Sequence, residues 1–213
     1  MIERSSGTCL CAVVGVAALL AGCGFGSVTT GETRTETVSF DVDDSKAARV
    51  ELRMGSGELT VGTGTAKFAE ATFTYNVVDW KPLVDYRAGA LSISQPNNAG
   101  SFGNTVNRWH VKVTTDLPLD FKADLGAGEV KMDLRGEPKR SYTVQIRGGV
   151  GETVVNLPKD VAISATATKG IGDINVEGLE QREGVWVNPD RIGAPVTVRL
   201  DVKGGVGAIR LVR

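Results

Sequence analysis

Hydrophobic and polar residues alternate with a period of two from residue 38 to the C-terminus. Val50, Leu52 and Met54 alternate with polar neighbours, and the same pattern recurs in the segments Phe73–Val77, Trp109–Val113, Val130–Leu134, Tyr142–Ile146 and Val196–Val202. Such alternation is typical of strands with one buried face and one solvated face. No stretch of ten residues in this part of the chain has a helical periodicity, so the sequence predicts an all-β domain.

A Gly-x-Gly triplet recurs five times between these segments, and Gly89-Ala90-Leu91 is a degenerate copy. Glycine adopts positive φ without a Cβ penalty, and a side chain at bends that stack ~4.8 Å apart would collide with the next layer. We expect three residues between the paired glycines, Val150, Ile171 and Val206, to point inward and fill the bend. The predicted structural turns are Gly55, Gly57, Gly126, Gly128, Gly149, Gly151, Gly170, Gly172, Gly205 and Gly207.

This spacing favours a parallel, solenoid-like β-helix in which strand–Gly-x-Gly–strand units stack on one another. The alternative is an antiparallel β-sandwich that uses the same triplets as hairpin bulges. The last unit runs almost to the C-terminus, so we expect the end of the chain to be a terminal strand. Arg210 and Arg213 would then protect its open edge.

The N-terminal segment 1–22 is typical of a secretory signal peptide, with an apolar run of about 11 residues that is too short to span a membrane. Leu20-Ala21-Gly22-Cys23 resembles the bacterial lipobox, which implies cleavage before Cys23 and a covalent lipid on its sulfur. Residues 23–37 are expected to be the lipidated cysteine and a flexible polar tether, and residues 38–213 the β-domain. The other two cysteines, Cys9 and Cys11, lie in the segment removed, so no disulfide is expected.

Composition and charge exclude two classes of function. The net charge is −1, from 24 basic and 25 acidic residues, and neither sign forms a stripe. Nucleic-acid binders normally carry a basic excess, so we expect no nucleic-acid partner. The chain has one histidine, His110, so a site that needs two histidines is excluded.

The residues that could be catalytic or bind a ligand are better explained by structural roles. Ser56 lies in a triplet too short for a nucleophile elbow, and His110 falls on the predicted wet face. No triplet continues into a phosphate-binding motif, so no cofactor is expected. Four carboxylates directly follow a second glycine and would form a row if the units stack in register; we expect a solvated row and no metal site. They are Glu58, Glu129, Glu152 and Asp173.

Trp80 and Trp186 lie near predicted turns, where tryptophan can be a recognition anchor. The interpretation we favour is that both cap the ends or bends of the core. The polar segment Pro96–Asn104 is the best place for an insertion or a contact site.

Three groups of segments carry a family resemblance. RVELRMGSGELTV, FTYNVVDWKPLVDYRAGALSISQP and DLPLDFKADLGAGEVKMDL resemble the N-terminal toast-rack domain of bacterial cell-surface proteins. GGVGETVVNLP, KGIGDINVEG and GGVGAIRLV are similar to the repeats that continue it, which also occur in LiaF-like membrane proteins and in surface adhesins. The resemblance implies a toast-rack fold and supplies no catalytic residues.

Three functions follow as hypotheses. The first is a non-catalytic, lipid-anchored envelope protein, outside the cytoplasm on the cell membrane or outer membrane, that contacts wall polymer, another envelope protein or its own copies. The second, implied by the LiaF-like resemblance, is a modulator of the response to wall-active antibiotics. The third is a glycan-active enzyme, which would need two carboxylates converging in a cleft.

Overall fold

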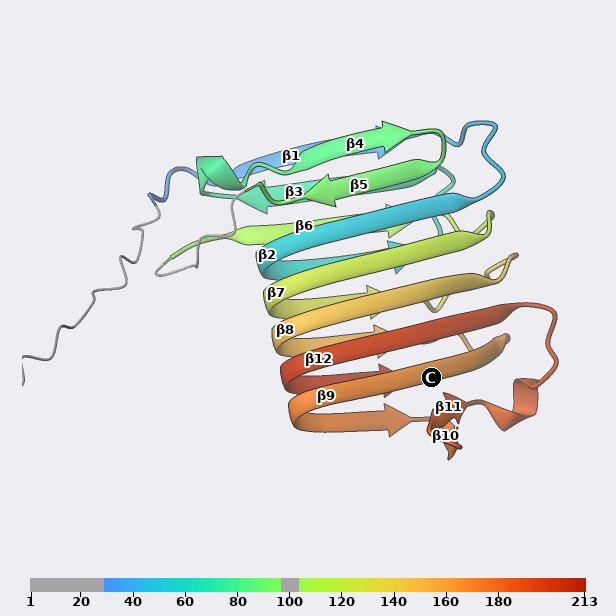
Figure 1. Cartoon of the computed structure of the whole chain (residues 1–213). Coiled ribbons are helices and arrows are strands. Elements are labelled where there is room, and N and C mark those ends of the chain that lie inside the picture. Colours follow the sequence, from blue (N-terminus) through green and yellow to red (C-terminus); the bar gives the residue numbers. More distant parts are fainter. Residues whose placement is uncertain (1–28, 97–103) are drawn as a thin grey trace, which may run out of the picture.

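Five long parallel strands form the body of the protein in a computed structural model that describes residues 29–96 and 104–213. Each strand bends at a Gly-x-Gly triplet, here called the corner; the half before the corner is arm 1 and the half after it is arm 2 (Figure 1). The strands lie in register, so corner rests on corner, and the predicted solenoid-like stack is confirmed. In stacking order they are β2 (Ala48–Thr63), β7 (Leu119–Asp133), β8 (Tyr142–Asn156), β12 (Thr197–Val212) and β9 (Ala162–Glu177).

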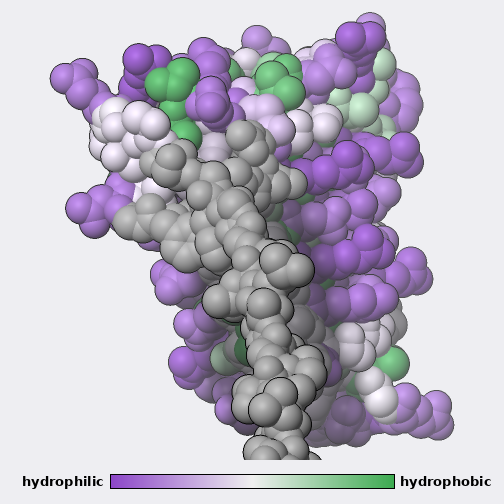
Figure 2. Space-filling model, turned by 60° about the vertical axis from the view of Figure 1, so that its left-hand side comes forward, coloured by the Kyte–Doolittle hydropathy of each residue, from purple (hydrophilic) through white to green (hydrophobic). Residues whose placement is uncertain are grey.

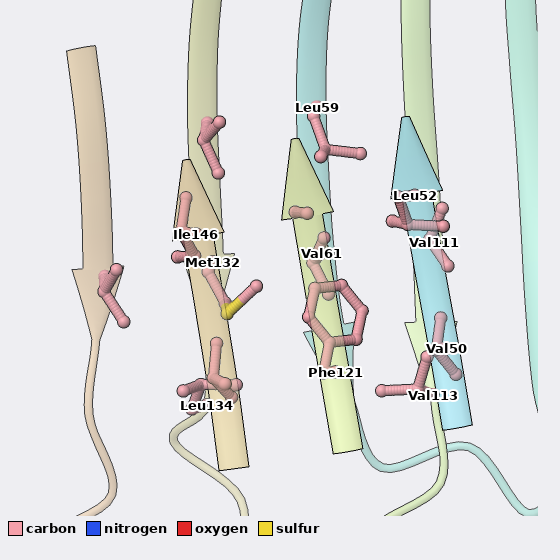
Figure 3. Close-up of a cluster of buried hydrophobic side chains, with 14 of the residues drawn as sticks. Val50, Leu52, Leu59, Val61, Val111, Val113, Phe121, Met132, Leu134 and Ile146 are labelled. Carbon is pink, nitrogen blue, oxygen red and sulfur yellow. The ribbon is translucent and has the colours of Figure 1, made fainter. Parts of the chain in front are cut away.

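The core lies between the two arms and follows from the alternation. Leu52, Ala123 and Ile146 are consecutive neighbours in arm 1 and are fully buried. Arm 2 directs Leu59, Met132 and other apolar side chains into the same space (Figure 3). Burying a large apolar side chain contributes about 1.5–3 kcal/mol relative to leaving it exposed. Packing between the arms therefore holds the stack together.

Shorter strands cover the N-terminal end of the stack on both arms. On arm 2, β6 (Asn107–Val113) pairs with β2 in parallel, and β3 (Ala69–Tyr75) and β1 (Arg34–Phe40) continue antiparallel. On arm 1, β5 (Ala90–Ser94) pairs with β2 and with β4 (Leu83–Arg87), which follows the 3₁₀ turn η1 (Val78–Trp80).

The C-terminal end is covered over a smaller part. A hairpin of β10 (Glu180–Arg182) and β11 (Val185–Val187) pairs with arm 1 of β9 at Ser164 and Ala165 only. The 3₁₀ turn η2 (Pro189–Arg191) then leads to β12. Within the described residues, 29–96 and 104–213, the corner and arm 2 of β9 pair with β12 alone.

The structure corrects three expectations. The last strand, β12, is not an edge: it lies between β8 and β9, and Arg210 and Arg213 form ion pairs with Glu177 and Asp190. Strand β1 begins at Arg34, inside the segment expected to be tether, because its residues pair with β3.

The third correction concerns the degenerate glycine copy. Gly89 forms the turn between the antiparallel strands β4 and β5 and is not a corner of the stack. Its φ is 73°, and a Cβ there would lie 2.6 Å from the side chain of Ser45. This glycine therefore serves a hairpin and a close approach of loops.

Candidate interaction surfaces

The five corners form a column in which glycine backbones pack directly on one another. A Cβ on Gly128 would overlap the carbonyl oxygen of Gly57, and one on Gly151 would overlap that of Gly128. These two glycines also have φ of 128° and 133°, which an L side chain rarely adopts. The ten glycines singled out in the sequence all lie in this column. Side chains are excluded at nine of them, where a Cβ would meet the neighbouring layer or cap: Gly57, Gly126, Gly128, Gly149, Gly151, Gly170, Gly172, Gly205 and Gly207.

The residues between the paired glycines point outward. Val150, Val206 and Ile171 are 57%, 47% and 70% exposed, so the expectation that they fill the bend is wrong. The inner side of the bend is already filled by side chains of arm 2: a Cβ on Gly148 would lie 3.5 Å from Thr153 Oγ1, and a Cβ on Gly204 would lie 3.2 Å from Ile209 Cδ1. Since β8, β12 and β9 are adjacent, the three side chains form an exposed apolar ridge along the corner.

The carboxylates that follow the corners lie in one row, as the in-register stack requires. Glu58 pairs with Glu129 and Glu129 with Glu152, whereas Ala208 of β12 separates Glu152 from Asp173. Arg108 Nε lies 3.2 Å from both carboxylate oxygens of Glu58, and Lys131 Nζ lies 2.7 Å from Glu129. In the part of the chain that the structure describes, no three acidic, histidine or cysteine side chains are grouped as a metal site would need.

On the other side of the corner, arm 1 carries an open groove of about 900 Å³. Its floor includes the backbone of Gly126 and Gly149, and Arg53, Arg147 and Leu83 stand around it. The Arg147 guanidinium is half exposed and its Nη1 lies 3.9 Å from Asp124. Asp124 also lines the groove, and Arg53 Nη2 lies 2.7 Å from Glu51, so both arginines have a carboxylate neighbour. Bare glycine backbone beside two partly exposed arginines suits an extended ligand that carries negative charge.

Charges on the outer face of arm 1 alternate between neighbouring strands. Lys122 of β7 lies 2.9 Å from Glu51 of β2 and 3.2 Å from Asp124 of its own strand. The hydrogen bond from Lys122 lowers the pKa of Glu51, and the same contact raises the pKa of Lys122. These pairs are partly exposed, so they fix the register more than they stabilise the fold.

The remaining candidate residues lie apart from one another. His110 is exposed on the outer face of β6, as predicted, and Ser56 lies at the corner of β2. Trp80 is buried in η1, and Trp186 of β11 packs against the core, so neither is a free recognition anchor. The segment Pro96–Asn104 lies largely outside the described residues, as do Cys23 and the signal segment.

Residues 29–177 match the family described as the N-terminal domain of toast_rack, DUF2154. The chain belongs to this family. The match spans the N-terminal end of the stack and four of its five long strands, and only β12 and the hairpin before it lie beyond the match. The family resemblance seen in the sequence is confirmed.

Solved structures also match, and one of them shares the architecture over most of its length. The "putative cell adhesion protein" of Clostridium sporogenes ATCC 15579 is 27% identical with a TM-score of 0.70, over 85% of this chain and 99% of that one. A "putative adhesin" of Bacteroides fragilis NCTC 9343 is 10% identical over 84% of this chain and 97% of that one, with a TM-score of 0.35.

One curated enzyme also matches in part. Thioredoxin reductase of Aquifex aeolicus is 32% identical over 103 residues, which are 46% of this chain, and the chain spans 32% of that enzyme's length. The described residues contain two 3₁₀ turns and no α-helix. Among the same residues no helix is long and apolar enough to cross a bilayer.

Proposed function

We propose that the protein is a non-catalytic, lipid-anchored envelope protein whose β-stack makes adhesin-like contacts with other surface components. The observation that carries this proposal is the similarity over nearly the full length of the Clostridium sporogenes protein, which is named for cell adhesion. The isolated position of His110, and the ion pairs that engage Glu58 and Glu129, add support, because catalysis needs such groups to converge.

The lipid anchor rests on the four lipobox residues that end at Cys23. Two or more acyl chains hold a protein stably at a membrane, whereas one chain does so only marginally. The mass of the N-terminal peptide of the mature protein tests the modification. Cys23→Ser should keep the unmodified mass and release the protein from the membrane fraction; a membrane-bound Cys23→Ser protein would contradict the anchor.

We assign the contact to the groove beside the corner, and an anionic polymer of the envelope to its partner. Arg53 and Arg147 supply charge that a polyanion would share with their carboxylate neighbours Glu51 and Asp124, and the exposed backbone of Gly126 and Gly149 lets a polymer chain approach closely. This groove runs beside stacked layers, so neighbouring repeats of a polymer could lie along neighbouring strands. The exposed Leu83 adds an apolar contact at its rim.

Binding of the full chain to purified wall fragments tests this assignment. Replacing Arg53 and Arg147 by Glu should weaken retention about ten-fold through lost and reversed charge. Arg199→Glu is the matched control, because Arg199 is also exposed on arm 1 but lines a separate groove of about 440 Å³. Equal loss for the control, or no retention of the unmodified chain above a tether-only peptide, would contradict the proposal.

A further inference from the structure

The C-terminal end of the stack exposes half a strand that has only one neighbour. Arm 2 of β9, from Gly172 to Glu177, pairs with β12 on one side, and no described residue of 29–96 or 104–213 pairs with its other side. The stack therefore ends on arm 2 as an open sheet edge. Such edges accept an added strand, with the backbone providing affinity and the side chains specificity.

The direction of the backbone identifies the free hydrogen-bonding groups. The Arg213 amide donates to the Glu177 carbonyl oxygen at 3.1 Å, so the polar groups of Glu177 face β12. Successive residues of a strand direct these groups to opposite sides, so Asn175 also faces β12, whereas Ile174 and Val176 face the open side. The edge thus offers two N–H groups and two carbonyl oxygens to an incoming strand.

The side chains along this edge have a definite chemistry. Asp173, Asn175 and Glu177 lie on the outer face and are exposed, and Glu177 Oε1 also accepts a 2.8 Å hydrogen bond from Arg210 Nη2 of β12. Ile174 and Val176 lie on the inner face, are half-buried and pack against the end of the core. A strand that fits here needs apolar residues opposite Ile174 and Val176 and polar or basic residues on its outer face.

The opposite end of the stack shows how such an edge is covered. There β6 runs parallel to arm 2 of β2 and places Arg108 beside Glu58, the first carboxylate of the same row that ends at Asp173. Lys112 lies four residues further on, at the register position that Glu177 occupies in β9. Two basic residues four apart on β6 thus match the spacing of the two acidic residues on β9.

We propose that the open edge of β9 binds an extended segment of another protein as an added parallel strand. The segment carries basic side chains at two outer positions four residues apart and apolar side chains between them. Among the described residues, a second copy of this chain offers no free strand of this kind. Its β6 is already paired on both sides, and its outermost strand β1 has Thr35, Thr37 and Ser39 on the outer face.

Pairing of β9 with β9 of another copy is also unfavourable. An antiparallel pair centred on Asn175 would place Asp173 opposite Glu177 twice, and like charges directly opposite destabilise a sheet. The inference adds a partner class to the contact role proposed above and uses a surface separate from the arginine groove. Its test is therefore independent of retention on wall fragments.

The probe is a labelled peptide with the sequence of β6, Asn107–Val113, added to the full chain in detergent micelles. Fluorescence anisotropy gives its affinity. Replacing Asp173 and Glu177 together by Lys should weaken binding about ten-fold. Glu152→Lys is the matched control, because Glu152 lies in the same exposed row two layers from the edge, and it should leave the affinity nearly unchanged.

Charge reversal in the peptide gives a second test. A peptide with glutamate at both basic positions should bind the unmodified chain weakly and the double-lysine variant more tightly. Hydrogen exchange supplies the structural readout: the peptide should slow exchange of the Ile174 and Val176 amides, while that of Asn175 and Glu177 is already slow. These results together would support an added strand at this edge.

Three results would overturn the inference. The first is unchanged exchange at Ile174 and Val176 when the peptide is bound, and the second is equal loss of binding in the Glu152→Lys control. The third is slowed exchange that depends on the concentration of the chain alone, which would assign the edge to a second copy. If wall-fragment retention still depends on Arg53 and Arg147, only this inference fails and the proposed function stands.

Discussion

The two ends of the stack differ in how completely other strands cover the outermost long strand. At the N-terminal end, three strands cover arm 2 of β2 and two cover arm 1 (Figure 1). The packing there is aromatic: the rings of Phe73 and Trp109 lie 5.6 Å apart edge to face, and Tyr86 lies against Phe40 and Phe68. At the C-terminal end, a three-residue hairpin strand covers part of arm 1.

The corners differ in the same way. At the N-terminal end Gln95 Oε1 accepts hydrogen bonds from the Gly55 amide at 2.9 Å and from Asn107 Nδ2 at 3.0 Å, and Asn107 Nδ2 also donates to the Ser56 carbonyl. Two buried amide side chains thus make the hydrogen bonds that a further layer would make with the corner of β2. In the described part of the chain no side chain does this for the corner of β9, where Ile171 is the most exposed large apolar residue.

The comparison shows that a repeat stack needs a separate solution at each end, because every layer leaves polar groups and apolar surface for the next one. Figure 2 shows mostly hydrophilic residues along the flanks of the stack, with hydrophobic patches near its upper end and at its lower right. Exposed apolar side chains belong to both ends: Val78 and Leu83 to the N-terminal one, and Ile171 and Ile192 to the C-terminal one. The two ends therefore differ in how much of the backbone of the outermost long strand is covered, and not in the hydrophobicity of their surface.

Truncating one inner residue at each end gives the largest expected difference. Trp109→Ala removes a fully buried ring and should lower the free energy of unfolding by about 3–5 kcal/mol. Ile174→Ala removes a half-buried side chain at the open end and should cost about 1 kcal/mol. Urea unfolding of both variants measures this, and equal losses would mean that the C-terminal end is as well packed as the other.

Removing the side-chain cap at the corner should have an intermediate effect. Gln95→Leu leaves the Gly55 amide and the Asn107 side chain without their acceptor, which should cost about 2 kcal/mol. Gln145→Leu, a half-buried residue on the outer face of β8, is the control and should change stability little. Thermal unfolding compares the two, and a neutral Gln95→Leu would show that the corner needs no cap.

The smallest effect is expected at a hydroxyl of the N-terminal end. Tyr75 Oη donates a 2.6 Å hydrogen bond to Glu36, whereas the buried hydroxyl of Tyr142 has no partner among the described residues. Tyr75→Phe should lower the free energy of unfolding by about 1 kcal/mol, whereas Tyr142→Phe should leave it unchanged or raise it. Chemical unfolding at neutral pH separates them, and a larger loss for Tyr142→Phe would contradict this assignment.

The hydrogen bond between Tyr75 and Glu36 predicts that the stability of the protein depends on pH. Burial, and then the bond to Glu36, raises the pKa of Tyr75 to about 12 from 10.0, so its stabilisation is present below pH 10 and is lost as pH rises towards 12. The hydrogen bond from Tyr75 and then that from Lys81 lower the pKa of Glu36 below 4.5, so its stabilisation is lost as pH falls through that lowered value. Tyr75→Phe should lose less stability than the unmodified chain at both extremes.

The sequence predicts the layers but not their order. Alternation marks inner and outer residues, and the triplets mark the corners, because both depend on local geometry. The position of β12 between β8 and β9 depends on which layers fit side by side. One signal was present: Gly148-Gly149-Val150-Gly151 and Gly204-Gly205-Val206-Gly207 are alike, and they are neighbours.

The candidate surfaces were predicted in part for the same reason. The carboxylate row follows from register alone, so it could be placed from the sequence. The open edge of β9 could not, because every unit has the same pattern and only tertiary pairing decides which one is last. The outward direction of Val150, Ile171 and Val206 was missed because apolar residues usually point inward, whereas buried side chains of arm 2, such as Thr153 and Ile209, already fill the inner side of the corner.

The account depends on the glycine column, and two adjacent residues of β8 test it most directly. A Cβ on Gly149 would overlap the Gly126 carbonyl oxygen of the next layer, whereas a Cβ on Gly148 would lie at an ordinary 3.5 Å from Thr153 Oγ1. Gly149→Ala should lower the free energy of unfolding by about 3 kcal/mol or more, and Gly148→Ala should leave it unchanged or raise it by about 0.5 kcal/mol. Equal effects of the two substitutions in urea unfolding would contradict the claim that backbone contact between glycines allows the layers to stack.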